Sequence, residues 1–372
     1  MVKRRRVPSV RDGGQVGCRL AALVTSGVLL AMVIAAAPAR AGVWSVAPLS
    51  SLDQDQSNGY GNLTADSCVA GGYCMALGVD DTRGLDHQVT LEEVYNGGTW
   101  TRVTGPAGFA HTYPAALSCS STTYCMAVGL ANAALWNGTS WRAVPSGGLI
   151  YFTAVSCAMT TCMAVGTRGR LDIPVAELWR NGVLRKIAAP LKAVSPDSVY
   201  CGSSSRCIVV GDFACPAQGP CPKSQPFAES WNGHSWAVMK GAGRSRHEVD
   251  HISCVSLTWC MGLGSSYSDI WNGRTWTYLG PAGHPLPPNV SCVSAVACEA
   301  VGSTTRPSNR NHFMALASQW NGHGWTNELV PDNGAASSQL VAVSCASTVL
   351  CTAVGNVGTE VLNPLAETWQ PS

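Results

Sequence analysis

Charged residues are scarce in this chain, where Asp, Glu, Lys and Arg make up 12% of the 372 residues. Residues 1–41 hold seven of the 24 Lys and Arg but only one of the 22 acids, so residues 42–372 carry a formal charge of −4. A protein without a basic surplus is not expected to bind nucleic acid, because phosphate contacts need clustered cations. No segment of 42–372 keeps a helical hydrophobic period, which argues against a mainly helical fold.

Long apolar runs are also missing beyond the amino terminus. There, a basic stretch that begins at Lys3 precedes the apolar segment from Leu20 to Ala37, and Ala39-Arg40-Ala41 offers the small residues at which a signal peptidase cuts. We therefore expect residues 1–41 to be a signal peptide, exported by the Sec or the twin-arginine route. Residues 42–372 would then be a single domain that is secreted to the extracellular space or cell envelope, without a membrane span after signal removal.

Cysteine, in contrast, is abundant and regularly placed. Beyond the amino-terminal segment sixteen cysteines form eight local pairs, and in seven of them a Gly follows the second Cys by four residues. Export and this spacing predict disulfides, whereas zinc ligands usually come as closer pairs in sets of four. We expect no metal ion and no other cofactor. The predicted disulfides are Cys68–Cys74, Cys119–Cys125, Cys157–Cys162, Cys201–Cys207, Cys215–Cys221, Cys254–Cys260, Cys292–Cys298 and Cys345–Cys351.

Seven of the cysteine pairs mark a repeat of about 46 residues, which is close to the length of a propeller blade. Each repeat can be divided into four short β-strands. In the second repeat they are 114–119, 124–129, 133–136 and 141–144, and Asn137-Gly138 provides the turn of the last hairpin. The sequence therefore predicts an all-β fold, a seven-bladed β-propeller with four-stranded blades.

The two ends of the repeat array complement each other. The last repeat stops just after Trp369, before its fourth strand, whereas residues 43–48 match the fourth strand of the second repeat. We expect the amino-terminal strand to complete the last blade and close the ring. The aromatic residues at repeat-equivalent positions are expected to form the core between blades. Trp259 lies outside these positions, in a predicted turn, and is a candidate for exposure.

The turns between the third and fourth strands resemble the end of the Asp-box, a motif of sialidase-type propellers. The resemblance rests on Gly97-Gly98-Thr99-Trp100 and on Gly138 to Trp141, and it departs from the motif where Tyr95 or Trp136 replaces the Asp. Over nearly all of 42–372, the cysteine-bearing unit also resembles exported bacterial repeat proteins described as propellers or sialidase-like. Because Asp-boxes are structural in those families, the resemblance implies a fold and no activity.

One face of the predicted ring carries the candidate binding residues. The loops between second and third strands vary in length and lie on that face, as is typical of loops that bind ligands. Solvated loops are often charged without a function, so both interpretations stay open. The fourth loop adds the Cys215–Cys221 pair, which would serve binding or protease resistance. The polar candidates are Asp80, Asp81, Arg83, Asp86, His87, Arg168, Arg170, Asp172, Arg306, Arg310 and His312.

We expect a monomeric, non-catalytic module that binds a glycan or a cell-surface protein. One alternative is a glycoside hydrolase of sialidase type, which needs paired carboxyls, or a Tyr nucleophile with clustered arginines. No Arg-Ile-Pro segment or Tyr–Glu pairing of that type is legible, and the catalytic residues would be unknown. The other alternative is a structural protein of the cell envelope.

A zinc-protease motif occurs once, where residues 247–251 read His-Glu-Val-Asp-His. That chemistry needs a helix, on which residues four apart share a face. Here the motif directly precedes Cys254, so it coincides with a predicted first strand. On a strand the two histidines would lie about 13 Å apart, too far for one zinc ion. We therefore do not expect a metalloprotease.

Overall fold

The structure is a computed structural model that describes residues 42–49, 61–81, 89–106, 109, 113–169, 173–189, 194–213, 226–242, 249–264, 266–307, 309–332, 334–359 and 361–372. All of them fall within one compact unit, Ala39–Ser372. Their regular elements are β-strands, and this part of the chain contains no α-helix. A helix of sufficient length and apolar character to cross a membrane is likewise not found among these residues.

Seven antiparallel sheets of four strands each make up the unit, which confirms the predicted propeller. Blade 1 comprises β2 (Gly61–Val69), β3 (Tyr73–Asp80), β4 (Val89–Asn96) and β5 (Trp100–Thr104). Blade 2 comprises β6 (Pro114–Ser121), β7 (Tyr124–Gly129), β8 (Ala133–Trp136) and β9 (Trp141–Val144). Blade 3 comprises β10 (Ile150–Ala158), β11 (Thr161–Arg168), β12 (Ile173–Arg180) and β13 (Val183–Lys186). Blade 4 comprises β14 (Val194–Ser203), β15 (Arg206–Phe213), β16 (Pro226–Trp231) and β17 (Trp236–Val238).

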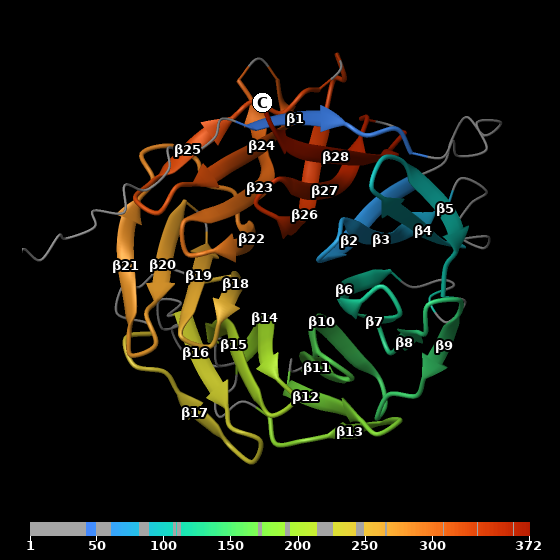
Figure 1. Cartoon of the computed structure of the whole chain (residues 1–372), viewed down its shortest axis with the longest axis vertical. Coiled ribbons are helices and arrows are strands. Elements are labelled where there is room, and N and C mark those ends of the chain that lie inside the picture. The colour runs from blue at the N-terminus through green and yellow to red at the C-terminus, as the bar shows by residue number, and fades with distance from the viewer. Residues whose placement is uncertain are drawn as a thin grey trace, which may run out of the picture. The chain divides into compact units, whose positions relative to one another are not determined.

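The remaining three blades repeat this order around the ring. Blade 5 comprises β18 (His251–Ser256), β19 (Trp259–Gly264), β20 (Tyr267–Trp271) and β21 (Trp276–Pro281). Blade 6 comprises β22 (Asn289–Ser294), β23 (Ala297–Arg306), β24 (Asn309–Trp320) and β25 (Trp325–Glu328). Blade 7 comprises β26 (Ser338–Ser347), β27 (Leu350–Val357), β28 (Asn363–Pro371) and β1 (Gly42–Val46). In Figure 1 the first strand of each blade lies innermost, and the chain returns to its starting point.

The amino-terminal strand closes the ring as predicted. β1 pairs with β28 in a register that places Trp44 opposite Trp369, the same pairing that joins Trp136 to Trp141 in blade 2. The indole N–H of Trp44 donates to Oε2 of Glu328 in blade 6 at 2.8 Å, and that of Trp369 donates to Oε1 at 3.0 Å. One carboxylate of blade 6 therefore binds both strands that complete blade 7.

Seven of the eight predicted disulfides are present in the described residues. Each joins the first strand of a blade to its second across directly paired positions, as Cys119 and Cys125 do with a Cα–Cα distance of 4.0 Å. The eighth predicted pair, Cys215–Cys221, lies outside the described residues. Since disulfides persist in oxidising compartments, seven of them in one domain indicate such a location.

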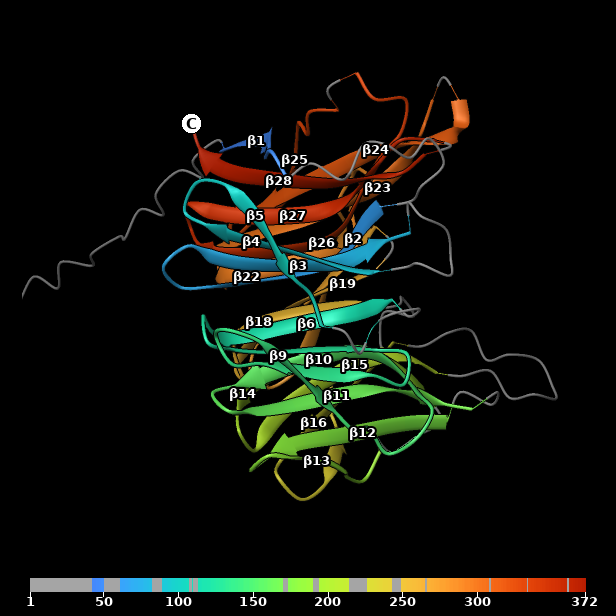
Figure 2. The same ribbon diagram turned by 90° about the vertical axis from the view of Figure 1, so that its right-hand side faces the viewer.

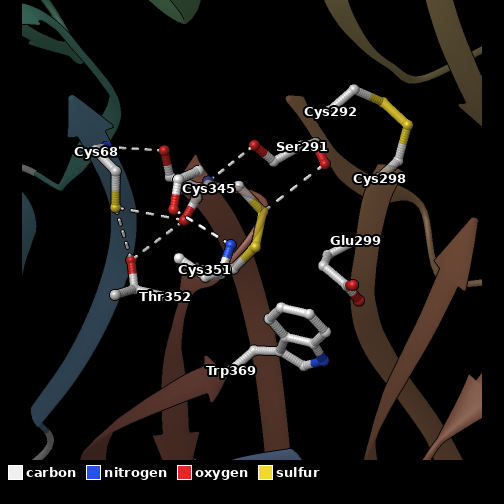
Figure 3. Close-up of a disulfide and its surroundings, with 12 residues drawn as sticks. Cys68, Ser291, Cys292, Cys298, Glu299, Cys345, Cys351, Thr352 and Trp369 are labelled. Carbon is white, nitrogen blue, oxygen red and sulfur yellow. Dashed lines mark hydrogen bonds between the residues drawn. A yellow bond between two sulfur atoms is a disulfide. The ribbon is translucent and has the colours of Figure 1, made fainter. Parts of the chain in front are cut away.

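Serine hydroxyls bond each blade to the next at the level of the cysteines. The Ser that precedes the first Cys of one blade accepts a hydrogen bond from the backbone N–H of the first Cys of the next, as Ser291 does from Cys345 at 2.9 Å (Figure 3). The bond from Cys68 to Ser344 links blade 1 back to blade 7 at 2.7 Å. In blade 4 Tyr200 stands at this position, and the hydroxyl of Ser198 accepts instead, from the backbone N–H of Ile252 at 3.2 Å. The six standard acceptors are Ser67, Ser118, Ser156, Ser253, Ser291 and Ser344.

The predicted Asn-Gly turns form because the asparagine side chain organises the backbone. In blade 2, Oδ1 of Asn137 accepts from the backbone N–H groups of Thr139 and Ser140, each at 2.9 Å. Gly138 adopts a φ of 97°, a left-handed conformation that glycine enters without steric cost. This geometry recurs at the same turn in blades 4, 5 and 6.

The repeated aromatic residues are core residues, as predicted. Trp44 is 2% exposed and Trp179 is 3% exposed, and cross-strand pairs such as Trp136 and Trp141 meet with ring centroids 5.6 Å apart. The expectation for Trp259 needs correction. It is the first residue of β19 rather than part of a turn, and it is half-buried against a core cluster that includes Met261.

Removing one of the seven disulfides is expected to cost a moderate amount of stability. A loop of this length contributes about 2 kcal/mol by the chain-entropy estimate. The double substitution of Cys119 and Cys125 by alanine should lower the free energy of unfolding by about that amount, measured by urea denaturation without reductant. An unchanged unfolding midpoint would contradict a stabilising role for this disulfide.

Candidate functional site

The innermost strands of all seven blades line a central cavity of about 220 Å³. Aliphatic and polar residues both line it, and polar atoms make up most of its exposed surface. The polar side chains include Asp66 of blade 1, Asp197 of blade 4, His251 of blade 5 and Asn289 of blade 6. Among the described residues that line this channel cavity, none is Lys or Arg.

Asp66 occupies a position that is aliphatic in the other six blades. It lies two residues before the first Cys of its repeat and is 9% exposed. Its Oδ2 accepts a hydrogen bond from the Thr352 hydroxyl at 3.0 Å, which places the carboxylate against the second strand of blade 7. Burial raises the pKa of Asp66 to about 7, although the Thr352 bond acts in the opposite direction. The aliphatic residues at this position are Leu117, Val155, Val199, Ile252, Val290 and Val343.

His251 stands on the same cavity at the start of β18. Burial lowers the pKa of its imidazole to about 4, so the ring is neutral at physiological pH. The last residue of the zinc-protease motif thus begins a strand, as expected, while His247 and Glu248 lie outside the described residues. The described residues contain no cluster of three or more His, Cys, Asp or Glu side chains that could bind a metal ion.

A second cavity, of about 400 Å³, opens on the face that carries the variable loops. We call it the blade 7 pocket. It lies where the crossover from blade 6 meets the loop ends of blade 7 and the segment after β1. Most of its lining is aliphatic or proline, and Asp332 and Ser338 are the polar side chains. The apolar side chains are Val46, Ala47, Pro48, Leu49, Pro331, Ala335, Val357, Pro364, Leu365 and Ala366.

Arg306, a predicted binding residue, bonds the crossover that forms the rim of the blade 7 pocket. Its guanidinium donates to Oδ2 of Asp332 at 2.6 Å and to the backbone carbonyl of Ala335 at 2.8 Å. The hydrogen bond from Arg306 lowers the pKa of Asp332 and burial raises it, and the pKa is lowered overall. Arg306 therefore shapes the crossover that lines the pocket.

The segment between the second and third strands of blade 6, which was expected to be a loop carrying Arg306, Arg310 and His312, is mostly a continuation of the β-hairpin. β23 and β24 stay paired as far as Thr305 and Phe313, and the two strands form the longest hairpin of the ring (Figure 2). Arg310 is exposed on β24, and Nε2 of His312 lies 3.4 Å from Nδ2 of Asn309. Both side chains belong to the register shift between the Thr305–Phe313 and Arg306–Asn309 pairs, so neither residue has a paired position on β23.

The other predicted site residues come from blades that are not neighbours in the ring. Asp80 ends β3 and Asp81 follows it as a buried residue, both in blade 1, whereas Arg168 is exposed at the end of β11 in blade 3. Five candidates lie outside the described residues: Arg83, Asp86, His87, Arg170 and Asp172. A common site for the candidates of blades 1, 3 and 6 therefore remains a prediction.

Buried carboxyl groups line the interfaces between blades, and the sequence analysis missed them. Five repeats carry an acid two residues before the third-strand aromatic residue. In blade 1 it forms an ion pair with Arg102 at 3.0 Å, and in blade 3 it accepts the backbone N–H of Gly147 at 3.2 Å. In blade 7 both oxygens of this acid are buried without a partner among the described residues. The five acids are Glu93, Glu177, Glu229, Asp269 and Glu367.

Comparison with known proteins identifies the fold. The chain is similar to a solved structure described as YCF48 bound to D1 peptide, with a TM-score of 0.55 and 11% identity over 87% of this chain and 99% of that chain. It is also similar to YCF48 from Cyanidioschyzon merolae, with a TM-score of 0.56 and 13% identity over 88% and 99% of the two chains. No family model and no curated protein matches the sequence. The Asp-box resemblance is therefore not confirmed.

The channel residues could have been found by aligning the repeats on their first cysteine. That alignment places Asp66 in a column of Leu, Val and Ile, and His251 in a column of otherwise small residues. A charged residue in a buried aliphatic column costs stability unless it is paired or hydrogen-bonded. Both residues lie inside predicted strands, whereas the predicted binding residues all belong to polar loops.

Proposed function

We propose that residues 42–372, exported after removal of 1–41, act as a non-catalytic module that binds an extended peptide segment of a partner protein. The blade 7 pocket is the proposed binding site. The observation that carries the proposal is the lining of this cavity, which is mainly aliphatic and proline. Such a lining suits one or two apolar side chains of a peptide.

A glycan is less well suited to this pocket than a peptide. Sugars present hydroxyl groups in several directions, and their recognition needs several convergent polar side chains. The pocket offers Ser338 and Asp332, and Asp332 already binds Arg306. The similar YCF48 structure described as bound to D1 peptide shows that a propeller of this shape can take a peptide. These points favour the protein partner over the glycan expected as an alternative.

Selection from a displayed library of random peptides tests the proposal. We expect the full chain, recovered with its disulfides formed, to enrich peptides with a shared apolar residue. Val357→Trp, which places an indole in the pocket, should weaken their binding at least about tenfold in isothermal titration. Val349→Trp is the matched control, because Val349 is 48% exposed in the turn after β26, at the opposite end of the same blade.

Two outcomes would contradict the proposal. One is that no peptide is enriched while a glycan array gives saturable binding. The other is that Val357→Trp and Val349→Trp bind the selected peptides equally well. Turnover of a fluorogenic sialoside by the same preparation would instead favour the hydrolase.

A further inference from the structure

The face of the ring opposite the variable loops consists of tight turns, and we call it the turn face. Figure 2 shows the ring from the side, with the two faces at opposite edges. None of the residues in these turns, and none of the strand residues that flank them, is Asp or Glu. In blade 7, Gly42, where the predicted cleavage leaves an amino group, lies beside the carboxyl end of the chain, so the two terminal charges offset each other. The turns are 70–72, 97–99, 122–123, 137–140, 159–160, 181–182, 204–205, 232–235, 257–258, 272–275, 295–296, 321–324 and 348–349.

Three arginines stand on this acid-free face. Arg180 ends β12, Arg206 begins β15, and Arg274 lies in the last turn of blade 5. All three are exposed, and none forms an ion pair with another described residue. Acids of the described loops and crossovers, such as Asp250 and Asp332, lie on the variable face instead. Because residues 42–372 carry a formal charge of −4, the turn face is a local cationic surface on an acidic domain.

Exposed apolar side chains lie between these arginines. Met159 in blade 3, Val296 in blade 6 and Val349 in blade 7 each occupy the turn between the first and second strands. Met159 is 69% exposed and Val296 is 57% exposed. Single apolar residues are common on protein surfaces, but here they form the outermost points of a face that otherwise carries cations and small polar residues.

Hydrogen bonds hold these turns in a fixed shape. The hydroxyl of Ser294 accepts from the backbone N–H of Val296 at 3.3 Å, and the same bond fixes Val349 in blade 7 at 3.2 Å. The hydroxyl of Ser120 donates to the carbonyl of Met159 at 2.5 Å, which ties the turn of blade 3 to blade 2. Because the apolar side chains stand on preorganised turns, a partner would order little backbone when it binds.

Cations and apolar side chains without acids suit the surface of a bilayer that contains anionic lipid. Headgroup phosphates attract arginine, and the layer just beneath them accepts small apolar side chains. A soluble anionic polymer would meet the same arginines but would leave Met159, Val296 and Val349 without an apolar partner. Neither cavity described above is lined by a residue of these turns, and a bilayer, unlike a small ligand, needs no cavity.

We propose that the turn face docks on the surface of a bilayer that contains anionic lipid. The three arginines contact headgroup phosphates, and Met159, Val296 and Val349 enter the interfacial layer. The blade 7 pocket opens on the opposite face, so a docked molecule presents that pocket away from the bilayer. Docking does not depend on what the pocket binds.

Co-sedimentation of the exported chain, residues 42–372 with disulfides formed, with lipid vesicles tests the surface. Residues 1–41 must be absent, because a basic and apolar segment binds bilayers by itself. We expect saturable binding to phosphatidylcholine vesicles with about 30% phosphatidylglycerol, at least about tenfold tighter than to phosphatidylcholine alone. Raising the salt to about 0.5 M should weaken it, since salt screens exposed charges.

Two triple variants locate the binding surface. Each basic residue near an anionic bilayer contributes about a factor of five to binding, so replacing Arg180, Arg206 and Arg274 with glutamine should weaken it about a hundredfold. The matched control removes the same charge from the variable face, through glutamine at the exposed residues Arg168, Lys240 and Arg310. Its affinity should stay within about threefold of that of the natural chain.

The tryptophan variants of the peptide test separate this proposal from the proposed function. Val349→Trp should bind the vesicles at least about threefold more tightly, because tryptophan is favoured at membrane interfaces. Val357→Trp should bind them like the natural chain. The proposal fails if vesicles with phosphatidylglycerol are not bound, or if the two triple variants bind them equally. It also fails if Val349→Trp has no effect while soluble polyglutamate displaces the chain, since the face would then take an acidic polymer.

Discussion

Replacing Trp44 with alanine is expected to lower the free energy of unfolding by about 4 kcal/mol, because it empties a buried site in the strand that closes the ring. Trp44 is 2% exposed and packs beside Trp369 in the interface between blades 6 and 7. The substitution also removes one of the two indole donors of Glu328. At about 2.1 cal/mol/K per residue the loss corresponds to a fall of about 5 °C in thermal midpoint, measurable by scanning calorimetry.

The control lies on the same strand. Val43 is 57% exposed, so Val43→Ala should change the free energy of unfolding by no more than about 0.5 kcal/mol. Deleting residues 42–48 removes the whole fourth strand of blade 7 and should have a larger effect than Trp44→Ala. If the deletion left the thermal midpoint unchanged, β1 would not stabilise the ring.

The sequence was sufficient to predict the blades because each repeat carries its own local signals. The cysteine pair fixes the first hairpin, and the Asn-Gly turn fixes the last. In blade 2, three of the four predicted strands have the bounds found in the structure. The first was predicted to end at residue 119 and continues to Ser121. Closure by residues 43–48 was predictable for the same reason, since Trp44 matches the fourth-strand tryptophan Trp141 of another repeat.

The candidate site was less predictable, because it depends on contacts between blades. From the sequence, Arg306 was predicted to be a binding residue without a partner in the protein. In the structure it bonds Asp332, which lies 26 residues later in the crossover to blade 7. No local pattern contains that pairing. Asp66 is a different case, since comparing the repeats with one another would have revealed it, whereas reading each repeat alone could not.

Stability is expected to fall by at least about 4 kcal/mol between pH 6.5 and pH 9, which is a fall of at least about 5 °C in thermal midpoint. The cause is a set of buried carboxyls whose pKa values are raised by burial. The pKa is raised to about 6 for Asp269, about 7 for Asp66 and Glu92, and about 8 for Glu367. Burial and the nearby Glu328 carboxylate also raise the pKa of Glu299 well above its usual range. Figure 3 shows Glu299 beside Trp369, near the ring closure.

The sign follows from proton binding. Above about pH 4.5 the unfolded chain has lost these protons, whereas the folded protein keeps each one up to its raised pKa. The stability from each carboxyl is therefore complete below the unfolded pKa and is lost as pH rises through the folded value. His251 acts in the opposite direction, since its lowered pKa costs stability only below about pH 6.5. The window from pH 6.5 to 9 thus reports the carboxyls.

Glu367→Gln isolates the pH-dependent loss of stability that comes from the Glu367 carboxyl, whose folded pKa is about 8. Both oxygens of Glu367 are buried without partners among the described residues, and glutamine resembles the protonated acid in shape. At pH 5 the variant should match the natural chain. At pH 9 it should be more stable by about 4 kcal/mol, because a folded pKa near 8 lies about three units above pH 5 and each unit costs 1.36 kcal/mol. Urea denaturation at the two pH values measures this difference. Equal destabilisation at both would mean that Glu367 acts by hydrogen bonding, and that deprotonation within the blade interface does not limit the stability of the ring.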